Sequence, residues 1–158
     1  MNTFVSTLIQ WRALGSGITE LTVPSYSLND GSLTVLDLTR FKRLKRIVIG
    51  DECFKYVDEV KLIGLNELES VVIGKNSFTK EKNGFGNEPN RHFYLKNCPK
   101  LRELIVGRYS FSDYSVIEIE NVDALEVIEI GNANNLNEES HNFHYASLEL
   151  KSILIHRE

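Results

Sequence analysis

The segment LKRIVIGDECF, residues 44–54, contains the pattern that decides the fold. Its first aliphatic residue, Leu44, is followed by a second three positions later and by a third two positions after that. Every position of this spacing holds Ile, Leu or Val in six copies, although only 42% of the chain is hydrophobic, so chance explains it poorly. The six copies are Ile18/Leu21/Val23, Leu44/Ile47/Ile49, Leu68/Val71/Ile73, Leu101/Leu104/Val106, Leu125/Ile128/Ile130 and Leu150/Ile153/Ile155.

The copies recur at distances typical of stacked repeats. Their starts are 26, 24, 33, 24 and 25 residues apart, a range that marks solenoid proteins. Alternating apolar residues favour a second strand before four of the copies, although the spacing of Phe54, Val57 and Val60 also fits a helix. We predict that each repeat contributes one strand to each of two sheets. The alternating pairs are Leu36/Leu38, Val60/Leu62, Phe93/Leu95 and Ile117/Ile119, always eight and six positions before a start.

Two further positions each recur in four of the copies. A glycine follows the first strand at 50, 74, 107 and 131, where the chain must turn, and a large apolar residue lies ten positions after the start. One repeat buries too few side chains to offset the ordering of its own backbone, so stability must come from stacking. We expect a mainly β, right-handed solenoid with two parallel sheets, about five to six coils and a short N-terminal helix. The corner residues would be Leu28, Phe54, Phe78 and Phe111.

On these motifs the chain resembles the leucine-rich-repeat superfamily over about residues 18 to 155. The stretches LKRIVIGDECF at 44–54, LESVVIGKNSF at 68–78 and LRELIVGRYSF at 101–111 are similar in particular to the BspA-like subgroup. The ninth-position Asn of the superfamily is present as Asn76, and Tyr26, Glu52, Tyr109 and Ala133 replace it elsewhere. That departure argues against an Asn ladder but not against the solenoid. BspA-like proteins are commonly surface or secreted interaction proteins, so the resemblance implies such a role.

The two ends depart from the pattern. Phe4, Leu8 and Trp11 are spaced as one face of a short helix, so residues 1–17 are expected to form an N-terminal cap, with a leader as the alternative. Residues 18–158 form the predicted solenoid, with an inserted loop at about 79–92. No segment that could cap the last coil follows Ile155. We therefore expect either a piece of a longer repeat protein or an end-to-end homo-oligomer through the C-terminal coil.

Composition excludes several classes of function. The formal net charge of −4 argues against general attraction to nucleic acid, and no apolar run is long enough for membrane insertion. Cys53 and Cys98 are too few for a disulfide framework and are expected in the core. The chain as given carries no signal peptide, which suits a cytoplasmic protein, whereas a segment of a BspA-like protein would be surface-exposed or secreted.

The outward positions of the first sheet supply the candidate site. Side chains alternate along a strand, so the residue between the last two apolar positions faces away from the core. Three successive repeats place Val48, Val72 and Ile105 there, in a row. This row predicts an apolar stripe for a protein partner; the alternative is that β-propensity alone selects these residues. The flanking charges are Arg46, Lys75, Glu103 and Arg108.

These observations favour a protein–protein interaction scaffold that binds a partner through the first sheet. The alternative is a structural spacer or self-associating segment of a larger surface protein. His141 and His144, near Glu138 and Glu139, are better explained as a solvated loop than as a metal site. Asp113 and Glu118 form no evident acid/base pair, and no catalytic motif occurs. We expect neither an enzyme nor a cofactor.

Overall fold

The computed structural model describes residues 2–80, 90–131 and 147–151. Within these residues the protein is mainly β, and its strands form two sheets in which all neighbours are parallel. Sheet A has the order β1 (Asn2–Phe4), β2 (Glu20–Val23), β4 (Arg46–Ile49), β6 (Ser70–Ile73), β8 (Glu103–Val106), β10 (Val127–Ile130). Sheet B has the order β3 (Val35–Asp37), β5 (Glu59–Ile63), β7 (His92–Lys96), β9 (Val116–Glu120), β11 (Ser147–Lys151). The two parallel sheets expected from the repeat are confirmed.

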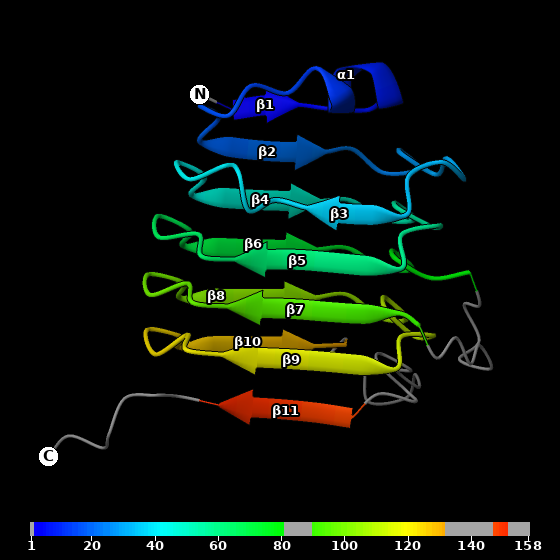
Figure 1. The fold of residues 1–158 in the computed structure, drawn as a ribbon. Coiled ribbons are helices and arrows are strands. Elements are labelled where there is room, and N and C mark those ends of the chain that lie inside the picture. The colour runs from blue at the N-terminus through cyan, green and yellow to red at the C-terminus, as the bar shows by residue number, and fades with distance from the viewer. Residues whose placement is uncertain (1, 81–89, 132–146, 152–158) are drawn as a thin grey trace, which may run out of the picture.

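From β2 onward the chain alternates between the two sheets, and each strand lies beside the equivalent strand of the next repeat (Figure 1). We call each sheet A strand together with the sheet B strand that follows it a unit, so that unit 1 is β2 and β3 and unit 5 is β10 and β11. Equivalent residues are in register across units; Ile47, for example, pairs with Leu21 on one side and Val71 on the other. The alternating pattern thus aligns along the whole stack.

The core lies between the sheets and follows the period-two alternation. In β5 the burial alternates along the strand, with Val60 and Leu62 fully enclosed between outward neighbours. This excludes the helical interpretation of Phe54, Val57 and Val60. The inward positions of β2, β4, β6 and β8 are all buried as the pattern predicted.

The corner position ten residues after each start forms an aromatic stack. The ring centres of Phe54 and Phe78 are 5.0 Å apart, and those of Phe78 and Phe111 are 4.6 Å apart, with interplanar angles of 14° and 7°. All three rings are fully buried. The three residues have φ of 55°, 57° and 60°, so the same left-handed turn recurs in units 2, 3 and 4.

A serine ladder runs beside this stack, in place of the Asn ladder that the sequence argued against. The Ser77 hydroxyl accepts a hydrogen bond from the Cys53 backbone N–H at 3.0 Å and donates to the Gly50 carbonyl at 2.8 Å. Ser110 repeats both contacts one unit further on, with Ser77 N–H and the Gly74 carbonyl. Each buried hydroxyl therefore satisfies two backbone groups of the preceding unit.

The recurrence of glycine directly after the sheet A strands reflects close stacking between units. A Cβ on Gly50 would lie 2.6 Å from the Ser25 nitrogen, and one on Gly107 would lie 2.5 Å from the Gly74 carbonyl carbon. Both distances are too short for any other residue. At these two positions glycine is required because the backbones of neighbouring units lie so close together. From the sequence, glycine was explained there only by the need for the chain to turn.

The N-terminal helix is present, but it is shorter than expected and does not include Phe4. Helix α1 (Leu8–Arg12) begins at a capping box between Thr7 and Gln10, and Leu8 and Trp11 pack against the core. Phe4 does not share its face. It lies in β1, which pairs with β2, and its side chain is 66% exposed. A strand rather than a helical turn therefore begins the structure.

The sixth copy of the repeat was assigned to the wrong sheet. Leu150, predicted to start a sheet A strand, lies in β11 of sheet B, where it pairs with Ile119, while Leu148 pairs with Ile117. Leu148 and Leu150 therefore take the place of an alternating pair. Pairing with β9 decides to which sheet these residues belong, a choice that the hydrophobic spacing alone left open. Ile153 and Ile155 lie outside the described residues.

The insertion is anchored at both of its ends by buried polar contacts. Before it, Thr79 hydrogen bonds with Ser112 at 2.7 Å, and the Lys80 N–H donates to Asp113 Oδ2 at 3.0 Å. After it, Arg91 Nη1 donates to the same Asp113 oxygen at 2.6 Å. The predicted loop of about 79–92 overlaps with β7, which begins at His92. Residues 81–89 lie outside the described part.

Candidate interaction surface

Sheet A brings the predicted apolar residues together on its outer face. Val48 pairs with Val72, and Val72 with Ile105, and each side chain is half-buried. We call these three residues the apolar row. The same line continues through Thr22 to Phe4 at the edge of the sheet. Phe4 was not predicted to belong here, because strand β1 lacks the repeat pattern.

A second outward row, two residues nearer the strand starts, carries Arg46 and Glu103. They lie on either side of Ser70 in the sheet register. The Ser70 hydroxyl donates a hydrogen bond to Glu103 Oε1 at 2.5 Å, and the Arg46 side chain is exposed on the other side. The two predicted charges are therefore close to the apolar row, as the sequence indicated.

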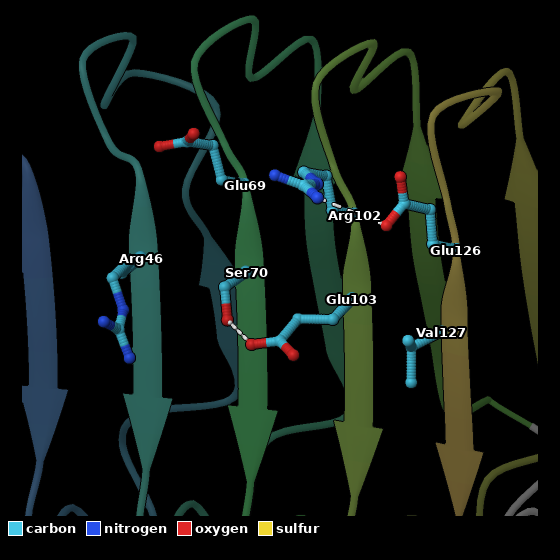
Figure 2. A pocket seen from close by; sticks show the side chains of 7 residues that line it. All are labelled: Arg46, Glu69, Ser70, Arg102, Glu103, Glu126 and Val127. Carbon is cyan, nitrogen blue, oxygen red and sulfur yellow. Dashed lines mark hydrogen bonds and ion pairs between the residues drawn. The ribbon is translucent and has the colours of Figure 1, made fainter.

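These side chains border a shallow pocket of about 370 Å³ on sheet A. Figure 2 shows its residues projecting from the beginnings of four neighbouring strands, with Arg46 at one end and Val127 at the other. The pocket is open to solvent and combines charged groups with the exposed aliphatic side chain of Val127. Its lining residues are Arg46, Glu69, Ser70, Arg102, Glu103, Glu126 and Val127.

Lys75 and Arg108 are placed differently from the other predicted charges. Strands β6 and β8 end at Ile73 and Val106, so both residues lie in the turns that follow. Lys75 is exposed, whereas Arg108 is partly buried with its guanidinium carbon 5.6 Å from the centre of the Tyr109 ring. They border the far end of sheet A and do not line the pocket.

The residues just before the sheet A strands form a charged edge that sequence reasoning missed. The sign alternates from unit to unit: basic in unit 2, acidic in unit 3, basic in unit 4 and acidic in unit 5. Opposite charges meet where Lys100 Nζ lies 2.8 Å from Glu67 Oε2, and Arg102 Nη2 lies 3.3 Å from Glu126 Oε2. Aligning the repeats would have shown this alternation. The edge consists of Lys42, Arg43, Lys45, Glu67, Glu69, Lys100, Arg102, Asp123 and Glu126.

The ion pair between units 3 and 4 also changes the acidity of its partners. Its hydrogen bond lowers the pKa of the Glu67 carboxyl and raises the pKa of the Lys100 ammonium. Because both groups are solvent-exposed, this pair contributes little to stability.

The outer face of sheet B neutralises its own charges. Lys61 lies 3.1 Å from Glu59, and Lys96 lies 3.0 Å from Glu120 and 3.6 Å from Glu118. The hydrogen bonds to Glu59 and Glu120 raise the pKa of Lys61 and Lys96, respectively. A partner would have to break these pairs in order to use them. Sheet A has the apolar row in the corresponding place.

Other predicted features are placed as follows. Cys53 and Cys98 are buried, and this burial raises the pKa of both thiols, consistent with core residues. Residues 2–80, 90–131 and 147–151 contain no group of three or more side chains able to hold a metal ion. The loop with His141 and His144 lies outside these ranges. In the described part, no helix is long and apolar enough to cross a membrane.

Comparison of the chain with protein-family models, with curated proteins and with solved structures found no match in any of the three.

Proposed function

We propose that this protein is a right-handed solenoid of the leucine-rich-repeat class that binds a protein partner on the outer face of sheet A. Residues 1–17 would cap its N-terminal end. The continuous register of sheet A supports this proposal, because it joins side chains from successive units into one surface. The surface has an apolar centre and a polar margin, the arrangement typical of protein interfaces.

One observation carries the proposal: the two sheets differ on their outer faces. Sheet B carries ion pairs on its outer face, and its outward apolar residues Val35, Ile63 and Val116 are not register partners of one another. Sheet A instead places the three residues of the apolar row side by side, next to an open pocket. If this face were exposed only to water, polar residues in place of Val48, Val72 and Ile105 would interact with it more favourably. Apolar residues at the centre of an open sheet face, with Phe4 exposed at its edge, favour contact with another protein.

Replacing Val72 with Glu should abolish binding of the partner without unfolding the protein, because it puts an unpaired charge at the centre of the apolar row. We expect affinity to fall by roughly a hundredfold, as at the centre of an interface. The matched control is Ile63→Glu, which likewise replaces an aliphatic residue with Glu at an outward position, in β5 of sheet B. The measurement is recovery of the partner from cell extract with each variant, followed by titration of the partner identified.

Retention of the partner by Val72→Glu, with an unchanged urea midpoint, would refute the assignment to sheet A. Equal loss of partner binding in both variants would indicate a general effect of the added charge. That result would also refute the assignment to sheet A.

Self-association through unit 5 is a second candidate, favoured by a separate observation. Ile128 and Ile130 occupy inward positions of β10, yet they are 49% and 39% exposed, whereas their equivalents in units 1 to 4 are buried. Another copy of the chain stacked on this end would cover them, as in the expected end-to-end oligomer.

Sedimentation velocity tests this candidate directly. We expect the protein to associate increasingly with concentration and Ile128→Glu to remain monomeric, while Ile63→Glu associates like the original protein. A monomer at all concentrations would exclude self-association and leave the binding of a different protein as the function.

A further inference from the structure

We propose that four basic residues at the start of unit 2 bind a short acidic segment of the partner protein. These residues, Lys42, Arg43, Lys45 and Arg46, are called the basic cluster. This inference rests on the proposed function, in that the ligand is a protein, and it adds the chemistry by which the partner is selected.

The basic cluster is exposed and lacks close ion pairs, although Lys42 and Lys45 interact at longer range with Asp37 and Glu67, respectively. All four side chains are exposed, and within the described residues none forms an ion pair with a carboxylate. The Lys42 ammonium donates a hydrogen bond of 3.3 Å to the Gly64 carbonyl. The equivalent cations of unit 4, Lys100 and Arg102, are both paired with glutamates of neighbouring units. The cations of unit 2 therefore lack the close glutamate partners that the cations of unit 4 have.

The position of the basic cluster suits a peptide that continues onto sheet A. Lys42, Arg43 and Lys45 border an open hollow of about 490 Å³, together with Thr19 and Glu67. Arg46 borders the neighbouring sheet A pocket, where Figure 2 shows it standing apart from the paired groups. A chain that places carboxylates in the hollow would thus be carried past Arg46 towards the apolar row.

The surroundings favour a short acidic peptide over a long polyanion such as nucleic acid. Glu20 pairs in register with Arg46 on one side, and Glu67 and Glu69 lie in the next unit on the other. Neighbouring strands are about 4.8 Å apart, so a phosphate backbone that crosses the units would meet these carboxylates at once. The net charge of −4 adds a general repulsion. A few carboxylates can fit within the one basic unit.

A direct binding measurement tests the proposal with a short fluorescein-labelled peptide of glutamate and serine as the probe. Fluorescence anisotropy should show binding that weakens as salt is added. The double variant Arg43→Glu/Lys45→Glu should weaken it at least about tenfold, because each change replaces attraction by repulsion. The matched control, Lys55→Glu/Lys80→Glu, changes net charge equally at two exposed lysines that lie over Tyr56, and should bind as the original protein does.

Absence of peptide binding, equal weakening in both double variants, or equally tight binding of single-stranded DNA would each overturn the proposal. Its failure is distinguishable from failure of the proposed function. If the peptide does not bind but Val72→Glu still abolishes partner binding, sheet A is the interface without the acidic specificity. If the peptide binds the basic cluster but Val72→Glu retains the partner, the acidic site stands and the apolar row is not the interface.

Discussion

Replacing Asp113 with Asn should destabilise the protein by about 3–5 kcal/mol, the usual cost of removing one partner from a buried ion pair. The Asp113 side chain is 0% exposed and that of its partner Arg91 is 1% exposed. Asn keeps the shape of the side chain but leaves the guanidinium charge without its buried counterion. Urea unfolding of the two proteins measures the difference as a lower midpoint with an unchanged slope.

The geometry around Arg91 shows why the loss is not easily compensated. Its Nη2 donates to the carbonyls of Lys55 and Val57 at 2.9 and 2.7 Å, and these neutral acceptors cannot replace a carboxylate. Its Nε lies 3.0 Å from Asp58 Oδ1 but is not aligned to donate a hydrogen bond. The Asp58 side chain is 41% exposed, so water weakens its attraction.

This difference in exposure provides the control. Asp58→Asn removes a carboxylate from the same arginine, but it should cost less than about 1 kcal/mol because the pair is partly solvated. The double variant Arg91→Met/Asp113→Leu should recover part of the stability lost in Asp113→Asn, since it removes both buried charges. Equal effects of Asp113→Asn and Asp58→Asn would contradict this account of the buried pair.

The Arg91–Asp113 pair also illustrates what the repeat pattern could not predict. Neither residue belongs to the aliphatic repeat: Arg91 follows the insertion, and Asp113 lies in the turn before β9. Apolar periodicity reports which residues face the core, but polar residues buried in pairs leave no periodic signal. The contact joins positions 22 residues apart, and their proximity becomes visible once β7 and β9 are aligned.

Where the units are regular, the sequence was a reliable guide to the fold. The apolar row could be aligned from the sequence because its three residues, Val48, Val72 and Ile105, lie at the same distance from the start of each repeat. Equal distance gives equal register in the sheet. The errors occur at the ends, where a strand has one neighbour. Phe4 was assigned to a helix because β1 is specified by backbone pairing with β2 rather than by its own apolar pattern. Leu150 fitted both phases of the repeat, and pairing with β9 selects one.

Replacing Phe78 with Ala should also destabilise the protein by about 3–5 kcal/mol, as expected for removal of a buried aromatic ring. Phe78 is the middle ring of the stack and contacts Phe54 on one side and Phe111 on the other. Its loss leaves a cavity between two rings that belong to different units. Alanine must also adopt the left-handed backbone of this position, where φ is 57°.

The effect of this change should spread beyond unit 3, because each unit depends on its neighbours for a core. We expect circular dichroism and tryptophan fluorescence to report the same lowered midpoint in urea, since Trp11 packs at the far end of the stack with its ring 5.9 Å from that of Phe54. Phe78→Leu should lose less, because Leu28 fills the equivalent corner in unit 1. Phe4→Ala, at a ring that is 66% exposed, should change stability by no more than about 0.5 kcal/mol. If the fluorescence midpoint stays unchanged in Phe78→Ala while the circular dichroism midpoint falls, the units do not unfold together and the aromatic stack does not couple them.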